Sequence, residues 1–153
     1  MHDETIRDPL TGCFNRRALD LIEERTGDGG WSVAVVDLDR FKYVNDTQGH
    51  ARGDEVLAAM GAFLRSVCAE DATVIRAGGD EFVVVADGSA LSREALQERI
   101  DQARKRTPHP FTLGWASREP GETLAGTMKR ADEKLYSDRR LRDLGNTTHE
   151  RRR

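Results

Sequence analysis

The sequence predicts an α/β protein in which helices cover a β-sheet. Helical and extended patterns alternate along the 153 residues, and such alternation is typical of a sheet flanked by helices. Each apolar run of strand type is short and ends at glycine or charged residues. The length fits one domain with a proper core. We expect one domain over residues 1–153, with flexible ends at 1–6 and 145–153.

The first part of the chain predicts three helical segments and one strand. Residues 15–25 carry apolar side chains on one helical face, and a glycine-rich stretch ends that helix. Residues 31–36 form an apolar run typical of a buried strand. A short helical turn over 41–47 stops near Gly49, and an amphipathic helix is expected over 54–68.

The second part predicts a hairpin, two helices and a further strand. Residues 73–77 and 82–86 are rich in β-formers and would pair around a tight turn. Ser92 is a natural N-cap for a helix that reaches residue 106. The last expected elements are a strand and a helix, over 111–116 and 123–142.

Charge and cysteine content argue against several classes of protein. The formal net charge is only −3, so the surface offers no bulk attraction to nucleic acid or membrane. The arginine clusters at 139–142 and 151–153 favour nucleic-acid binding, but the acidic balance opposes it. No apolar run fits a membrane span or a signal peptide. Cys13 and Cys68 lack metal-site spacing, and Cys68 fits a helix core. We expect a cytoplasmic domain of bacterial type.

Polar residues gather in two segments that border apolar strands. One is VDLDRFKYVNDTQGHARGD, residues 36–54, and the other is GGDE, residues 78–81. Ligands collect at strand ends in α/β sheets, so Asp37 could meet Asp80 and Glu81 at one site. Converging carboxylates repel one another unless a cation lies between them, and oxygen ligands favour magnesium. The alternative is that these acids are solvated loop residues.

Gly78 and Gly79 suggest that the hairpin turn has a special requirement. Without Cβ atoms they permit positive φ angles, and they let a bulky ligand lie directly against the backbone. An ordinary hairpin needs only Asn-Gly or Asp-Gly at this place. The glycine pair therefore favours a ligand site, and a turn that serves the fold alone is the alternative.

Four motifs, in order, resemble the GGDEF domain of the diguanylate cyclase family. They are DPLTGCFNRRAL from Asp8, DLDRFKYVNDTQGHARGDEVL from Asp37, RAGGDEF from Arg76, and TLG with ADEKLY from Thr112 and Ala131. The resemblance covers nearly the whole chain. It implies a mainly antiparallel central sheet flanked by helices, the palm-like fold of nucleotidyl cyclases. It also implies the condensation of two GTP molecules into cyclic di-GMP and two pyrophosphates.

The resemblance implies a metal site and a set of catalytic residues. Two Mg²⁺ ions, or Mn²⁺ in their place, would be held by Asp37, the carbonyl of Leu38 and Asp80, with Glu81 sharing them. Asp80 would accept the proton of the 3′-hydroxyl. Lys42 matches the cation that stabilises the transition state, although most lysines are simply solvated. Such a reaction needs mainly positioning and charge neutralisation from the protein.

The resemblance also implies a nucleotide pocket. Its expected substrate-binding residues are Asn45, His50, Asp54, Gly78, Gly79 and Arg139. Independently of the resemblance, a carboxylate such as Asp54 can accept hydrogen bonds from both N1–H and N2–H₂ of guanine. Adenine offers no such donor pair, so it would leave the acid unpaired. A lone histidine such as His50 would more often be structural.

Several residues of the last helix depart from the family pattern. Arg139 keeps the charge of an expected phosphate-binding lysine, but Asp143 reverses the charge of an expected arginine. Either the triphosphate is held more weakly, or Arg140 or Arg142 takes over. Asp39 lies on the same strand face as the acid two residues before it and has no assigned role.

The reaction that the resemblance implies requires two copies of the chain. A ring with two equivalent phosphodiesters needs two GTP molecules facing each other, hence a two-fold homodimer that can be transient. A sensor domain upstream would normally bring the copies together. Ala69 and Ala72 replace the RxxD product-inhibition motif, so feedback by cyclic di-GMP at that motif is not expected. The alternative function is a non-catalytic GTP-binding module that regulates a partner domain.

Overall fold

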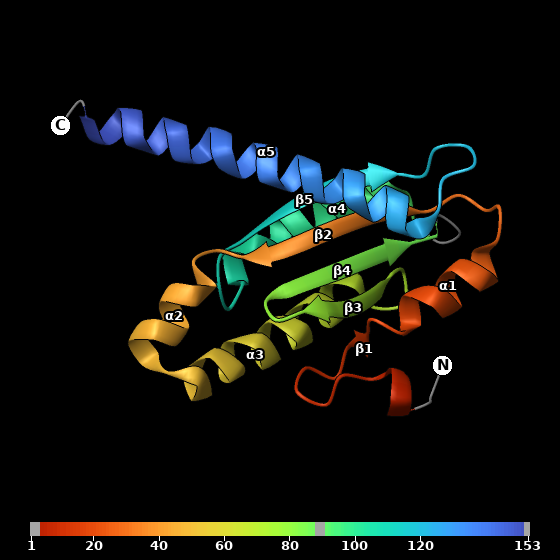
Figure 1. The fold of residues 1–153 in the computed structure, drawn as a ribbon, viewed down its shortest axis with the longest axis horizontal. Helices are drawn as coiled ribbons and strands as arrows, with labels where there is room; N and C mark the ends of the chain where they lie inside the picture. The colour runs from red at the N-terminus through yellow and green to blue at the C-terminus, as the bar shows by residue number, and fades with distance from the viewer. Residues whose placement is uncertain (1–3, 88–90, 152–153) are drawn as a thin grey trace.

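The computed structural model describes residues 4–87 and 91–151, which form one five-stranded sheet with helices on both faces (Figure 1). The order in the sheet is β1-β3-β4-β2-β5. β1 pairs with β3 in parallel, and the other three pairings are antiparallel. The strands are β1 (Phe14–Asn15), β2 (Ser32–Leu38), β3 (Thr73–Gly78), β4 (Glu81–Ala86) and β5 (Phe111–Ser117). The mainly antiparallel sheet expected from the sequence is confirmed.

The helices follow the predicted order but differ in their bounds. They are α1 (Ala18–Thr26), α2 (Phe41–Gln48), α3 (His50–Cys68), α4 (Arg93–Ala103) and α5 (Leu124–Arg151), with 3-10 turns η1 (Glu4–Ile6) and η2 (Arg104–Arg106). Gly49, with a φ of 88°, ends α2 and begins α3, so α3 starts four residues before position 54. The two-residue strand β1 was not predicted, because so short a strand has no periodicity of its own.

The two ends of the chain differ in part from the prediction. α5 continues to Arg151, past the expected end near residue 142. The stretch after 142 contains no proline, which would have stopped the helix. The 3-10 turn η1 lies within the predicted flexible end 1–6. The flexibility of the ends itself stays a prediction, and residues 1–3 and 152–153 lie outside the described residues.

Two apolar layers sandwich the sheet, which explains why β2 is apolar without interruption. Val33 and Val35 of β2 pack against α1 and α5. Ala34 and Val36 face the opposite way and pack with α2, α3 and α4. Cys68 is fully buried in this second layer, as its helical spacing predicted. None of the helices in the described part of the chain is both long and apolar enough to cross a membrane.

A close approach between β5 and α5 brings the last helix over the end of β2. Gly114 of β5 lies directly beneath the helix, and a Cβ atom there would come within 2.5 Å of the Leu135 nitrogen and collide with the Ala131 carbonyl. Because glycine removes this obstacle, α5 rests on the sheet along its first part and then extends past the sheet (Figure 1). The helix thereby carries Arg139 and Arg142 to the acids at the end of β2.

Candidate active site

Asp37 and Asp80 come together at one end of the sheet. Asp37 lies near the end of β2, and Asp80 lies in the turn between β3 and β4. The N–H of Leu38 donates to the carbonyl of Asp80 across 3.4 Å, which ties the turn to the strand. Burial and the neighbouring charge of Asp37 raise the pKa of Asp80. The structure therefore brings together the two acids that the sequence predicted would converge.

The acid pair fits a hard cation. Asp37 Oδ1 is buried and accepts no hydrogen bond from the described residues. Two ionised carboxylates cannot satisfy each other, so a proton or a cation must lie between them. Among the described residues no three His, Cys, Asp or Glu side chains gather closely enough to hold an ion. An ion here would therefore complete its shell with backbone oxygen, water or phosphate, as Mg²⁺ commonly does in nucleotide enzymes.

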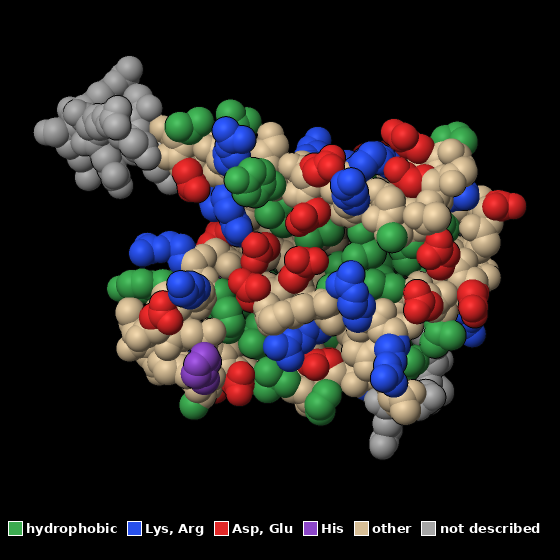
Figure 2. Space-filling model, in the orientation of Figure 1, with side chains coloured by type: hydrophobic (Ala, Val, Ile, Leu, Met, Phe, Trp, Pro, Cys, Tyr) green, Lys and Arg blue, Asp and Glu red, His purple; other side chains and the backbone are tan. Residues whose placement is uncertain are grey.

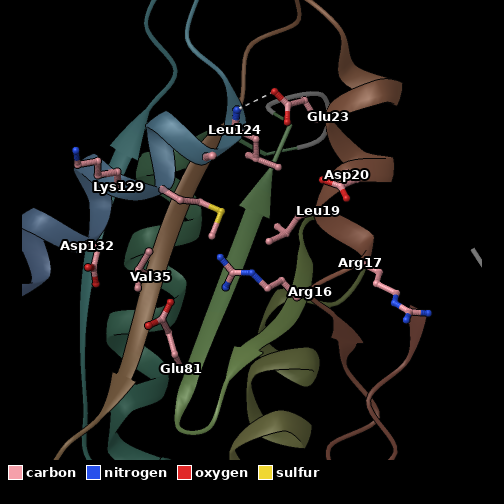
Figure 3. A pocket seen from close by; sticks show the side chains of 12 residues that line it. Arg16, Arg17, Leu19, Asp20, Glu23, Val35, Glu81, Leu124, Lys129 and Asp132 are labelled. Atoms are coloured by element: carbon pink, nitrogen blue, oxygen red, sulfur yellow. Dashed lines mark hydrogen bonds between the residues drawn. The ribbon is translucent and has the colours of Figure 1, made fainter. Parts of the chain in front are cut away.

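Glu81 lies on a different side of the turn from Asp80. It pairs in register with Asp37 across β2 and β4, and it lines a cavity of about 560 Å³ together with Arg16 and Asp132 (Figure 3). Burial, followed by the charges of Asp132 and Asp37, raises the pKa of Glu81. The metal-binding role expected for Glu81 stays a prediction.

The cavity beside Glu81 separates α1 from α5. Hydrophobic side chains form its floor and charged side chains its rim, as Figure 2 shows in the hollow below α5. On the face shown in Figure 2, basic and acidic side chains are interspersed and form no continuous basic patch. The absence of nucleic-acid binding expected from the charge balance stays a prediction.

A second cavity, of about 380 Å³, opens between α2, α3 and the hairpin turn. Its volume lies in the range of small-molecule sites, about 300–1,000 Å³. Its lining includes five predicted site residues beside Asp80, namely Lys42, Asn45, His50, Asp54 and Gly79. Phe41 and Leu57 add apolar walls that suit a flat base. Asn45 packs against Gly53, where a side chain would collide with it.

Gly78 and Gly79 leave the turn without side chains, but one of the two reasons predicted for them is wrong. Neither glycine has a φ in the left-handed region, so the turn does not use the positive φ angles that the sequence suggested. A Cβ atom at either position would meet open space. The other predicted reason, a bare backbone that a ligand can approach closely, stays a prediction, as does the alternative of a turn that serves the fold alone.

Arg76 and Asp8 brace the turn, and neither was predicted as a site residue. Arg76 donates from Nε and Nη2 to the carbonyl of Gly79, at 3.2 and 2.9 Å. Its Nη1 pairs with Asp8 at 3.3 Å. Burial alone would raise the pKa of Asp8, but hydrogen bonds from Thr11 and the charge of Arg76 lower it. The N-terminal DPLT motif thus supports the GGDEF turn, a contact visible only once the chain has folded.

Arg139 of α5 faces the acids at the end of β2. Its Nη1 lies 2.8 Å from Asp37 Oδ2, and its Nη2 lies 2.9 Å from Asp39 Oδ1. Arg142, one turn further along the helix, reaches Asp39 Oδ2 at 3.3 Å. Arg140 instead lies over the ring of Tyr136, 5.9 Å from its centroid. Of the two arginines considered as replacements for the expected one at 143, Arg142 therefore joins the site.

The sequence of this chain is similar to those of a known family of proteins. The sequence matches the family described as "Diguanylate cyclase, GGDEF domain" over residues 5–143. It is 34% identical to diguanylate cyclase DgcP of Pseudomonas aeruginosa, over 90% of this chain and 23% of that protein. It is 33% identical to diguanylate cyclase DgcM of Escherichia coli K12, over 84% of this chain and 35% of that protein. The cyclic di-GMP phosphodiesterase PdeR of E. coli is 32% identical over 85% of this chain and 22% of that protein. The chain thus spans about a third or less of these relatives.

Solved structures agree with the sequence comparison. The coiled coil and GGDEF domain of DgcB from Caulobacter crescentus, in complex with c-di-GMP, superposes with a TM-score of 0.78 at 28% identity, covering 90% of this chain and 82% of that one. Diguanylate cyclase SiaD of P. aeruginosa, in complex with its activator SiaC, gives a TM-score of 0.76 at 32% identity, covering 90% and 59% of the two chains. The palm-like cyclase fold expected from the sequence is confirmed.

Proposed function

Because the chain belongs to the GGDEF-domain family of diguanylate cyclases, we propose that it condenses two GTP molecules into cyclic di-GMP and two pyrophosphates. The observation that carries the proposal is the pair of acids Asp37 and Asp80 beside a nucleotide-sized cavity. Each catalytic step joins the 3′-oxygen of one GTP to the α-phosphorus of the other. The bond from that phosphorus to the pyrophosphate oxygen breaks as the new bond forms.

Asp54 selects guanine in this proposal. It lines the cavity from the first turns of α3, beside Asn45 and His50. Its carboxylate accepts hydrogen bonds from N1–H and N2–H₂ of guanine, and adenine cannot offer that pair of donors. Asn45 can donate or accept near the same edge, and His50 supports the substrate from the helix start. The glycine turn 78–79 lies open to the nucleotide on the opposite side.

Asp37, the carbonyl of Leu38 and Asp80 would hold two divalent cations, Mg²⁺ or Mn²⁺, with Glu81 nearby on the same strand pair. Cations bound there would neutralise phosphate charge and stabilise the departing pyrophosphate. Two observations support this placement: Asp37 Oδ1 is buried without a hydrogen-bond partner, and burial together with the charge of Asp37 raises the pKa of Asp80.

Asp80 also accepts the proton of the attacking 3′-hydroxyl. Burial and the charge of Asp37 raise its pKa, whereas a bound cation would oppose that shift. Lys42 lines the cavity beside Asp80, and Arg139 lies on the far side of Asp37. These two cations would compensate the charge that develops on the transferred phosphate and on the pyrophosphate.

The chemistry needs a second copy of the chain, since one cavity of this size holds one GTP. A two-fold dimer would place the two nucleotides face to face. The coiled coil in the DgcB structure and the activator bound to SiaD show that relatives carry or bind further elements beside the GGDEF domain. We expect that a sensor domain linked to this chain pairs two copies of it in the cytoplasm.

The deciding experiment combines product analysis with a binding measurement. The domain, fused to a dimerising coiled coil, is incubated with GTP and Mg²⁺, and the mixture is separated by chromatography. Cyclic di-GMP and pyrophosphate in a ratio of one to two are expected. Asp80→Asn is the control, and it should retain GTP without releasing product.

One other outcome points to a different function. GTP binding by calorimetry with no product from the unaltered domain would identify a non-catalytic GTP-binding module that regulates a partner domain. The reversed charge at Asp143 and the resemblance to the phosphodiesterase PdeR favour this second candidate.

A further inference from the structure

Asp39 is held at every hydrogen-bonding group that it has. Its N–H donates to the carbonyl of Pro110 at 2.9 Å, and its own carbonyl contacts His109 Nε2 at 2.6 Å. The hydroxyl of Thr112 donates to Asp39 Oδ1 at 2.7 Å. The next residue, Arg40, has a left-handed backbone with a φ of 54°, so a strained turn also begins here. The backbone groups of Asp39 brace this turn, and its side chain makes contacts of its own.

The Asp39 carboxylate joins two arginines of α5. Arg139 Nη2 lies 2.9 Å from Oδ1, and Arg142 Nη1 lies 3.3 Å from Oδ2. Arg142 Nη1 also donates to the hydroxyl of Thr112 at 2.9 Å. The side chain of Asp39 is 16% exposed and that of Arg142 is 45% exposed. One half-buried carboxylate therefore contacts two guanidinium groups, of which the outer one is about half exposed to solvent.

We infer that Asp39 positions Arg142 as a second phosphate-binding cation, in place of the arginine expected at Asp143. This inference rests on the proposed function, because it names the residue that holds the outer part of the GTP triphosphate. The contacts of Arg142 within the described residues all use Nη1. Its Nε–H and Nη2–H₂ groups therefore remain available as a planar pair of donors, which is the arrangement with which guanidinium groups bind two phosphate oxygens.

The order of contacts places Arg142 at the outer end of the site. Starting at the nucleotide cavity, Asp80 neighbours Asp37, Asp37 pairs with Arg139, Arg139 pairs with Asp39, and Asp39 pairs with Arg142. A triphosphate that passes the acid pair from the base side meets Arg139 first and Arg142 last. Arg142 consequently contacts the terminal phosphates rather than the nucleoside or the α-phosphate.

The charges of Arg139 and Arg142 explain why an acid such as Asp39 is needed between them. Two arginines close together on one helix repel each other, and the carboxylate between them offsets that repulsion. The Thr112 hydroxyl and both guanidinium groups surround the Asp39 carboxylate, and these contacts keep the two arginines in place.

The test measures the binding of GTP and of GMP to the unfused domain at low concentration with Mg²⁺, where product formation is negligible. Arg142→Ala should weaken GTP binding by about tenfold, the usual effect of one charge-assisted hydrogen bond, and should leave GMP binding unchanged. Asp39→Asn should shift GTP binding in the same direction, and the two changes combined should cost less than their sum. Arg140→Ala is the matched control, and it should leave both affinities unchanged.

The outcomes separate this inference from the proposed function. If Arg142→Ala binds GTP as tightly as the unaltered domain does, or if GTP and GMP lose affinity equally, Arg142 has no role at the outer phosphates. If GTP binding responds as expected while the dimerised domain makes no cyclic di-GMP, catalysis fails and the positioning role stands. Arg142 is a surface residue, so its removal leaves the fold intact even if Asp39→Asn proves unstable.

Discussion

Asp39 and Asp80 lie at the same end of the sheet, yet their pKa values are shifted in opposite directions. Burial raises the pKa of both. At Asp39 the hydrogen bonds from Thr112 and Arg139 outweigh burial and lower the pKa. At Asp80 the charge of Asp37 adds to burial. Their different environments therefore give the two acids different roles. Asp39 remains an anion that holds two arginines in position, whereas Asp80 can take up a proton or a cation.

Asp54 makes the sharpest prediction for a single residue. Asp54→Ala should weaken GTP binding by about 1–3 kcal/mol, the worth of hydrogen bonds to a charged acceptor, and should affect ATP much less. Competition calorimetry with both nucleotides measures the difference. Glu55→Ala is a suitable control, because Glu55 pairs with Arg52 outside the cavity. If GTP and ATP lose binding affinity equally, Asp54 does not distinguish guanine from adenine.

At the scale of elements, the sequence predicts those parts of the site that are local in the chain. The segment 36–54 and the turn 78–81 each carry their polar residues within one strand–turn unit, so their positions follow from the predicted strands. The brace from Asp8 to Arg76 joins residues 68 positions apart, and no periodicity reveals it. From the sequence, either Arg140 or Arg142 could replace the arginine expected at 143. The packing of α5 on β5 places Arg142 beside Asp39.

The same packing limits what the sequence could say about element bounds. The start of α3 and the end of α5 were predicted wrongly, because a glycine that joins two helices and a polar helix that leaves the sheet give no apolar signal. The buried strands and the amphipathic helices were predicted well, because their periodicity reflects the two apolar layers directly.

Gly114 tests the contact between β5 and α5. Gly114→Ala would place a methyl group against the helix backbone at Ala131 and Leu135, which cannot move aside as a flexible side chain would. The free energy of unfolding should fall by about 1–3 kcal/mol, typical of overpacking. Urea denaturation followed by circular dichroism measures this change.

Gly145→Ala is the control for that substitution. A Cβ atom at Gly145 meets nothing within 4 Å, and alanine favours a helix by roughly 0.8–1 kcal/mol over glycine. This variant should be as stable as the unaltered domain or slightly more stable. If Gly114→Ala proves equally harmless, the close approach does not hold α5 on the sheet.

At the scale of the whole molecule, the proposed site is half of a catalytic centre. The cavity beside Asp80 has a volume of about 380 Å³, within the range of small-molecule sites. The product of the proposed reaction has two-fold symmetry, so each copy of the chain would supply one nucleotide and one set of acids. The rate should therefore report how often two copies meet, as well as how fast the chemistry proceeds.

Dependence on protein concentration tests this requirement. For the unfused domain at concentrations where dimers are rare, doubling the concentration should raise the initial rate of cyclic di-GMP formation about fourfold by mass action. Fusion to a dimerising coiled coil should make the rate simply proportional to concentration, because pairing no longer limits it. Adding excess Asp80→Asn domain to the unfused protein should lower the yield of cyclic product, since mixed pairs join only one of the two bonds. A rate per molecule that stays constant on dilution of the unfused domain, and that resists the added variant, would mean that a single chain completes the ring.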